Sequence, residues 1–229
     1  MNIMKHLIAL LLMASFAHAS MAQPCRSFTL KDYDRWHDVS ATKIKDNGSL
    51  ISWEWNPQKG DGKLIVYQTL TQKYDTIHRA YDAAFFADAH GVVAKVKPYR
   101  DLIRKQTLDG VKKDKLTKDS LVIRLYEPDT TIIREGLRTF KVPQKSGRLM
   151  AWMFEENYGP KADTAVADTA KKAAKKPARL KQAGKVYTLG VFDAKTLETQ
   201  YFHHVSDYVF SAEGVLSFVT QNAKGDSSF

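Results

Sequence analysis

A unit that recurs along the chain constrains the fold more than any other feature. Its first copy runs from Ala41 to Ile77, where short strand-forming segments alternate with polar turns and a Gly-rich reversal at Gly60–Gly62. The strands that we expect lie at 41–44, 50–55, 64–67 and 74–77. Four short strands joined by tight turns form an antiparallel meander, which is the blade of a β-propeller. The sequence therefore predicts an all-β fold built from such blades.

Three later segments repeat the opening of this unit. In the four copies an apolar residue (Ile44, Phe86, Phe140, Phe210) precedes a polar turn with a glycine (Gly48, Gly91, Gly147, Gly214) and an alternating apolar strand. Hairpin reversals need a positive φ, which explains the glycine, and the alternation buries one strand face against a neighbouring blade. The second half of the unit recurs at 121–134 and 186–203. We therefore expect an incomplete β-propeller at 41–229, with about three blades and the start of a fourth.

The spacing of the turn glycines predicts two insertions between blades. The intervals are 91 − 48 = 43, 147 − 91 = 56 and 214 − 147 = 67 residues, whereas propeller repeats run about 40–50 residues. The first insertion, 97–118, is charged and expected to be partly helical. The second, 159–184, is rich in Ala and Lys and almost free of large apolar residues, so we expect a disordered loop. A membrane-surface helix is the alternative, but the segment has no apolar stripe.

The N-terminus has the pattern of a secretory signal peptide. Lys5 precedes an apolar run at 7–16, and small residues follow it. We expect residues 1–22 to be removed, with cleavage after Ala19 or Ala22, and the protein to be periplasmic or extracellular. The run is shorter than the ~20 residues of a membrane-spanning helix, so we expect no stable membrane insertion, with a retained anchor as the alternative. Cys25 is the only cysteine, so an internal disulfide is excluded.

Residues 23–40 are predicted to form an N-terminal segment with a short helix. Thr29 is suited to cap it, and Asp32 falls in its first turn near the positive end of the helix dipole. Leu30, Tyr33 and Trp36 are spaced to share one face. We interpret this segment as a packed N-terminal turn.

The formal charge of +10 does not indicate nucleic-acid binding once its location is considered. Between Lys161 and Lys185 there are seven Lys and one Arg against two Asp, a net charge of +6, and Lys5 adds one more. The remainder is 10 − 6 − 1 = +3, which is ordinary for a folded domain. A basic patch interleaved with aromatic residues is not visible, so we predict no nucleic-acid partner.

The sequence contains no recognisable catalytic or ligand-binding motif. The G-x-S-x-G elbow of serine hydrolases does not occur. Gly60-Asp61-Gly62-Lys63 lacks the residues of a phosphate loop, because Leu64 follows the lysine. His203 and His204 would point to opposite faces of a strand and could not readily share a metal ion. We therefore predict no catalytic, cofactor-binding or metal-binding residue, and no cofactor.

The isolated histidines and the aromatic residues are interpreted structurally. His37, His78 and His90 are expected at surface or turn positions. The large aromatic residues could form a carbohydrate platform, but their strand spacing favours an inter-blade core. The residues concerned are Trp53, Trp55, Trp152 and Phe218.

Three segments together resemble a known family. They are FTLKDYDRW at Phe28–Trp36, the pattern T-x-I-x-D-x-G from Thr42 to Gly48, and GDGKLIVYQTLTQKY at Gly60–Tyr74. They resemble the start of exported bacterial prolyl oligopeptidase-like serine peptidases, which have a signal peptide, then a β-propeller, then an α/β-hydrolase domain. The resemblance implies a propeller that caps a peptidase and screens substrates by size. That family's catalytic Ser, Asp and His lie in the hydrolase domain, and no position here matches its motif.

The resemblance leads to one functional expectation and two alternatives. We expect the non-catalytic propeller portion of a secreted serine peptidase, with peptide substrates and an α/β-hydrolase domain that is missing from this chain, which ends just after a blade-opening strand. By itself the chain is predicted to be inactive. The first alternative is a stand-alone periplasmic propeller-type protein that binds peptides or glycans. The second is an envelope-binding protein that acts through the Lys-rich loop at 159–184.

Overall fold

The computed structural model describes residues 27–33, 36–156, 158–160, 185–221 and 227–228. The predicted signal peptide, Cys25 and residues 161–184 of the predicted loop lie outside this part of the chain. Among the described residues, none of the helices has the length and apolar character needed to cross a bilayer. The described residues fall into two units, one that ends at Trp36 and one that begins at His37.

The first unit contains the short helix expected within 23–40. It is α2 (Leu30–Tyr33), and Thr29 lies directly before it. The backbone N–H of Thr29 and its hydroxyl both donate to a carboxylate oxygen of Asp32, at 2.8 and 2.7 Å. This is the backward half of a capping box, in which a first-turn acidic side chain holds the capping residue. The rings of Tyr33 and Trp36 lie 5.0 Å apart.

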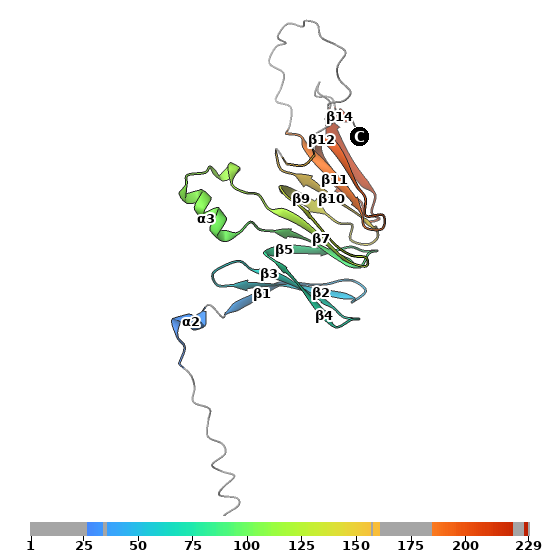
Figure 1. Ribbon diagram of the computed structural model, residues 1–229. Helices are drawn as coiled ribbons and strands as arrows, with labels where there is room; N and C mark the ends of the chain where they lie inside the picture. Colours follow the sequence, from blue (N-terminus) through green and yellow to red (C-terminus); the bar gives the residue numbers. More distant parts are fainter. Residues whose placement is uncertain (1–26, 34–35, 157, 161–184, 222–226, 229) are drawn as a thin grey trace, which may run out of the picture. The chain divides into compact units, whose positions relative to one another are not determined.

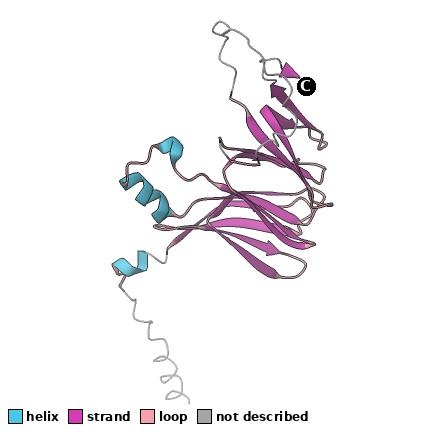
Figure 2. Ribbon diagram, turned by 45° about the horizontal axis from the view of Figure 1, so that its top comes forward, coloured by secondary structure: helices cyan, strands magenta, loops and turns pink. Residues whose placement is uncertain are grey.

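The second unit is a succession of antiparallel four-stranded meanders, which we call blades, and the predicted fold class is confirmed (Figures 1 and 2). Blade 1 contains β1 (His37–Ile44), β2 (Leu50–Pro57), β3 (Lys63–Gln68) and β4 (Lys73–His78). Blade 2 contains β5 (Ala80–Phe85), β6 (Gly91–Val96), β7 (Ser120–Tyr126) and β8 (Asp129–Arg134). Helix α3 (Arg100–Leu108) and the 3-10 turn η2 (Lys113–Lys115) lie between β6 and β7, in the predicted charged insertion.

The last sheet joins blade 3 to the start of blade 4. It contains β9 (Leu137–Lys141), β10 (Leu149–Phe154), β11 (Tyr187–Asp193), β12 (Thr199–Phe210), β13 (Leu216–Gln221) and β14 (Ser227–Ser228), in the order β14-β13-β12-β11-β10-β9. The first half of β12 pairs with β11 as the fourth strand of blade 3. Its second half pairs with β13 as the opening strand of blade 4. The expected fourth blade therefore continues directly from the third, without a break between strands.

The first strand starts earlier than the sequence indicated. We placed the propeller start at residue 41, but β1 begins at His37, which pairs with Pro57 of β2. The four added residues are largely exposed, so they have no apolar alternation that would reveal a strand. A shift in register between Ser40 and Lys43, where Ala41 has a φ of 49°, separates this polar part from the predicted strand.

Each blade passes to the next through one residue in the left-handed region. The residues are Arg79, Gly136 and His204, with φ of 62°, 70° and 61°. Each is followed by a buried apolar residue, which is Ala80, Leu137 or Val205. At Gly136 a side chain is excluded for a second reason, because a Cβ would lie 1.9 Å from the Tyr158 ring. The left-handed residue turns the chain from the last strand of one blade into the first strand of the next.

The cores lie between blades and use both faces of the middle strands. In β10, Met150, Trp152 and Phe154 pack in a cluster with residues of blade 2, whereas Ala151 and Met153 pack with β12 of blade 4. Because successive side chains of a strand point to opposite faces, this alternation places one blade on each side of β10. A third cluster joins Leu50, Leu64 and Val66 of blade 1 to blade 2. We had expected one buried face per strand, and blades 2 and 3 bury two.

The turns between the first and second strands also link successive blades. The ammonium group of Lys45 donates to the Ala89 carbonyl at 2.7 Å, and the Gly147 N–H donates to Asp88 at 2.6 Å. Burial lowers the pKa of Lys45, against the opposing effect of nearby Asp88 and Asp46. The Ser146 hydroxyl then donates to the Glu213 carbonyl at 3.1 Å. The four predicted glycine turns therefore lie at one end of the blades and are connected in sequence order.

Candidate functional site

A cavity of about 750 Å³ lies at the opposite end of the blades, next to the insertion. We call it the insertion cavity. Its lining comes from three blades and from the insertion: Asn56, Pro57, Gly60, Asp61, Gly62, Arg79, Lys97, Pro98, Arg100, Ile103, Lys113, Leu116, Thr117, Lys118, Asp119, Leu137, Arg138 and Glu155. The glycine turns lie at the other end because every strand runs from one end to the other (Figure 1).

Arg79 is held between the blades and the insertion. Its backbone N–H donates to the Gly62 carbonyl at 2.8 Å, and its guanidinium Nη1 donates to the Lys97 carbonyl at 2.6 Å. The guanidinium also lies over the Tyr99 ring, 3.7 Å from its centroid. Its Nε is buried and has no partner among the described residues. The left-handed backbone of Arg79 therefore serves two purposes, since it starts blade 2 and directs the side chain toward the insertion.

Further hydrogen bonds hold α3 to blade 1 and to the last part of the insertion. The Arg100 N–H, in the first turn of α3, donates to the Asp61 carboxylate of blade 1 at 3.1 Å. The Gln106 amide donates to Thr117 Oγ1 at 2.8 Å and accepts the Thr117 N–H at 3.1 Å, which ties the helix to the segment after it. A carboxylate near a helix N-terminus stabilises the helix through its dipole. The wall of the cavity is thus held at both ends of α3.

The Tyr81 hydroxyl donates a short hydrogen bond to the carboxylate of Asp119, the residue that directly follows the insertion. Burial, the hydrogen bond and the charge of Asp119 all raise the pKa of the Tyr81 phenol. The Asp119 carbonyl also accepts the Leu137 N–H of blade 3 at 2.7 Å. Asp119 therefore joins blade 2 to blade 3 directly under the cavity.

The cavity lining has an excess of positive charge. It contains six Lys and Arg residues against Asp61, Asp119 and Glu155, so its formal charge is 6 − 3 = +3. Glu155 pairs with Arg138 at 3.6 Å, and the other two carboxylates accept the hydrogen bonds just described. Arg100, Lys113 and Lys118 form no ion pair within the described part of the chain. An anion entering the cavity would therefore meet cations that are free to bind it.

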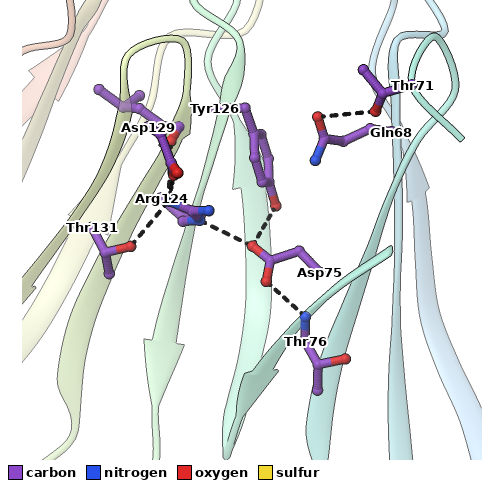
Figure 3. Close-up of polar contacts among 9 residues, drawn as sticks. Gln68, Thr71, Asp75, Thr76, Arg124, Tyr126, Asp129 and Thr131 are labelled. Carbon is purple, nitrogen blue, oxygen red and sulfur yellow. Dashed lines mark hydrogen bonds and ion pairs between the residues drawn. The ribbon is translucent and has the colours of Figure 1, made fainter. Parts of the chain in front are cut away.

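A second polar cluster lies in the seam between blades 1 and 2 (Figure 3). The Asp75 carboxylate of β4 accepts Arg124 Nε at 3.0 Å and the Tyr126 hydroxyl at 3.1 Å, both from β7. Arg124 also pairs with Asp129 and contacts Thr131 Oγ1 at 3.3 Å. Every charged group in this cluster is paired, so it joins the blades and leaves nothing to hold a ligand.

The same seam cluster shifts two pKa values. Burial first, and then the charge and hydrogen bond of Asp75, raise the pKa of Tyr126. Burial acts against the charged form of Arg124, but Asp75 and Asp129 outweigh it and raise the pKa of the guanidinium. Both shifts favour the protonation states that the hydrogen bonds require.

The histidines that the sequence analysis considered as possible metal ligands have different neighbours in the structure. His203 Nδ1 lies 3.2 Å from Thr188 Oγ1 on the neighbouring strand, and His204 is an exposed residue at the bend of β12. His90 Nδ1 lies 3.6 Å from Glu127, which is 81% exposed at its side chain. No group of three or more potential metal ligands occurs among the residues that the structure describes. The absence of metal-binding, cofactor-binding and catalytic residues stays a prediction.

The aromatic residues divide into two groups. Trp152 is fully buried between blades 2 and 3, as an inter-blade core residue should be. Phe218 is half-buried and packs against the cluster between blades 3 and 4, which also agrees with a core position. Trp53 and Trp55 are half-buried and belong to none of the core clusters of the described residues, so the core interpretation is wrong for these two. Gly60–Gly62 lies in the turn between β2 and β3, and Asp61 and Gly62 line the insertion cavity.

Sequence reasoning did not identify the insertion cavity. Its lining is drawn from segments as distant as Asn56 and Glu155, and no short motif joins them. The one feature of the sequence that could have indicated the cavity is the charge of residues 97–118, which we interpreted only as typical of a surface insertion. Of the free cations named above, all three lie in that segment.

No protein-family model matches the chain, and none of the curated proteins is similar to it. Among solved structures, the β-propeller domain of the Trilobed protease from Pyrococcus furiosus matches 76% of this chain and 46% of its own length, with 10% identity and a TM-score of 0.44. Pyrococcus horikoshii acylaminoacyl peptidase matches 86% of this chain and 30% of its own, with 9% identity and a TM-score of 0.44. The chain thus spans less than half the length of these structures. A likeness at these values carries no residue or activity over to this chain.

Proposed function

We propose that this chain is the non-catalytic propeller portion of an exported, prolyl oligopeptidase-like serine peptidase. In this proposal the propeller screens peptide substrates by size, and an α/β-hydrolase domain supplies the catalytic residues. The observation that carries it is the sequence resemblance over Phe28–Tyr74, because the resembling residues coincide with structural elements. FTLKDYDRW contains α2, and the GDGKLIVYQTLTQKY segment contains the β2–β3 turn, β3 and the start of β4.

The chemistry of the described residues agrees with a non-catalytic role. Peptide hydrolysis by this route needs an activated serine, a histidine base, an orienting carboxylate and an oxyanion hole. His203 and Thr188 bring an imidazole and a hydroxyl together, but the two residues lie on the paired strands β11 and β12. A serine nucleophile of this family instead lies on a sharp turn between a strand and a helix. The sequence also lacks G-x-S-x-G throughout.

The resemblance is tested by reading the coding sequence beyond Phe229 and by assaying the chain alone. The proposal predicts an open frame that continues to a G-x-S-x-G elbow. It also predicts no hydrolysis of chromogenic peptides with Pro or Ala before the scissile bond, and no labelling by a serine-reactive phosphonate. A stop codon directly after Phe229 would instead favour a stand-alone binding protein for peptides or glycans.

Activity of the purified chain would contradict the proposal in a different way. Turnover that survives repurification, together with covalent labelling of a single serine, would show a catalytic site within these residues. A chain in which each candidate serine is replaced by alanine in turn would then identify the nucleophile. If only one of these variants is no longer labelled by the phosphonate, the serine replaced in that variant is the nucleophile.

A further inference from the structure

The insertion cavity has the size and the fixed walls of a small-ligand site. Its volume of about 750 Å³ falls in the range of about 300–1,000 Å³ that ligand pockets occupy. The walls are held by the Asp61 contact to α3, the Gln106–Thr117 pair and the Tyr81–Asp119 hydrogen bond. A site whose walls are already ordered loses less conformational entropy when a ligand binds.

The charges in the cavity favour an anionic ligand. All three lining carboxylates are engaged by groups of the protein, as described above. Arg100, Lys113 and Lys118 remain without an ion pair in the described residues. Arg and Lys form charge-assisted hydrogen bonds with carboxylates that are about twice as strong as neutral ones. The unpaired cations therefore give the cavity a preference for ligands that carry carboxylates or other oxyanions.

The apolar part of the lining narrows the ligand further. Pro57, Ile103, Leu116 and Leu137 lie among the polar residues of the cavity. A bare phosphate or other small oxyanion would leave this apolar surface in contact with water. A ligand that joins an apolar body to two or more carboxylates would cover the apolar surface and bind the cations together. A short peptide that alternates apolar and acidic residues has this chemistry.

We propose that the insertion cavity binds a short acidic peptide, whose carboxylates are held by Arg100, Lys113 and Lys118. The side chain of Arg79 lies at the same site, with a buried Nε that has no partner in the described residues. It is a structural part of the wall and not a free ligand for the peptide. The proposal rests on the cavity alone and not on the proposed membership of a peptidase, so either can fail without the other.

The first arm of the test compares two peptides on the unaltered chain. Calorimetric titration uses acetyl-Leu-Glu-Leu-Glu-amide and the neutral acetyl-Leu-Gln-Leu-Gln-amide, which has nearly the same shape. We expect the Glu peptide to bind at least about tenfold more tightly at low salt, a difference of about 1.4 kcal/mol. The preference should decrease as salt is added, because salt screens charges at a partly exposed site. Equal binding of the two peptides, or binding of neither, would overturn the proposal.

The second arm uses two variants of the insertion with the same change in charge. The cavity variant carries Arg100→Gln, Lys113→Gln and Lys118→Gln. The control carries Arg104→Gln, Lys105→Gln and Lys112→Gln, whose side chains lie in the same insertion but do not line the cavity. We expect the cavity variant to lose the roughly tenfold preference for the Glu peptide and the control to keep it. An equal loss in both would show that the net charge of the insertion binds the peptide, and not the cavity.

Inorganic phosphate provides the third arm, because it offers an oxyanion without an apolar body. We expect millimolar phosphate to leave the bound Glu peptide in place. Displacement of the peptide by phosphate would mean that the cavity is a general oxyanion site and would overturn the peptide assignment. Melting curves of both variants check that each is folded, and if the cavity variant is not, the peptide comparison on the unaltered chain still decides the proposal.

Discussion

Trp53 and Trp152 occupy the same place in two blades but have different surroundings. Each lies five residues after its turn glycine, since 53 − 48 and 152 − 147 both equal 5, and each is in the second strand of its blade. Trp152 is fully buried, and the backbone of Gly190 approaches so closely that a Cβ there would lie 2.5 Å from the indole. Trp53 is half-buried, and it contacts the ring of Tyr74, which is 68% exposed.

The difference comes from the neighbouring blade and not from the residue. In β10 the side chains at even positions face blade 2, and Trp152 is one of them. In β2 the residues that face blade 2 are Leu50 and Ser52, so Trp53 points to the other side of the sheet. No blade among the described residues covers that side. A tryptophan at this position of the repeat becomes core when the preceding blade lies against it.

The largest effect is expected for Trp152→Ala. Removing a fully buried indole leaves a cavity between blades 2 and 3, so the free energy of unfolding should fall by about 3–5 kcal/mol. Denaturant unfolding followed by circular dichroism measures it. A loss below about 1 kcal/mol, which is typical of a surface change, would mean that blades 2 and 3 do not pack as described.

A smaller effect is expected in the seam between blades 1 and 2. A double-mutant cycle with Asp75→Asn and Arg124→Gln should give a coupling of about 1 kcal/mol, because the pair is partly buried and hydrogen-bonded. The matched control is Arg124 with Asp129, whose side chain is 80% exposed. Its coupling should be nearer to zero, as for most exposed pairs. Equal couplings would show that the seam does not shield Asp75 from solvent.

Trp53→Ala should cost about 1 kcal/mol, since the indole leaves no closed cavity when it is removed. The same unfolding experiment, run at several protein concentrations, sharpens the comparison with Trp152. A cost as large as that of Trp152→Ala would show that the outer face of blade 1 is covered in solution. If that cost then depended on protein concentration, the cover would be a second copy of the chain.

The tyrosines of the blade contacts predict a loss of stability at alkaline pH. Burial, first among the causes, raises the pKa of Tyr208 to about 12, and it also raises that of Tyr126. The unfolded chain releases these protons near pH 10, whereas the folded chain retains them. The stability is therefore fully present below about pH 10 and decreases as the pH rises toward the folded values.

Tyr126→Phe separates this contribution from the others. The variant lacks one of the protons that the folded chain retains, so its free energy of unfolding should decrease less steeply above about pH 10 than that of the unaltered chain. Below that pH the free energy of unfolding of the variant should be lower by about 1 kcal/mol, because the hydrogen bond to Asp75 is lost. Parallel curves above pH 10 would show that Tyr126 is not shielded in the seam.

Much of the fold could be predicted because its signals are local. Gly48, Gly147 and Gly214 have φ of 69°, 126° and 85°, a region that few other residues tolerate. The expectation of a positive φ is wrong at Gly91, the first residue of β6, where a side chain is excluded because a Cβ would lie 2.5 Å from Leu125. The passages between blades were harder to recognise, because Arg79 and His204 adopt the left-handed region without being glycine. The polar half of β1 was missed because its strand is set by pairing with β2 and not by apolar alternation.

The candidate site could not be predicted, and neither could the exposure of Trp53. The insertion cavity depends on how three blades and α3 meet in space. Which of its cations are unpaired becomes clear only when the partners of the lining carboxylates are known. The exposure of Trp53 depends on the absence of a neighbour among the described residues, whereas its sequence context matches that of Trp152. Sequence repeats predict the blade but do not state which of its faces are covered.

The accessibility of the two indoles tests the central claim most directly, namely that burial at this position of the repeat depends on the preceding blade. Each of two variants keeps one tryptophan, Trp53 or Trp152, and has phenylalanine at the other tryptophan positions. Acrylamide quenching of the fluorescence is then measured on the folded chains. The structure predicts strong quenching and red-shifted emission for Trp53, and weak quenching with blue-shifted emission for Trp152. Equal quenching of the two indoles would contradict the account.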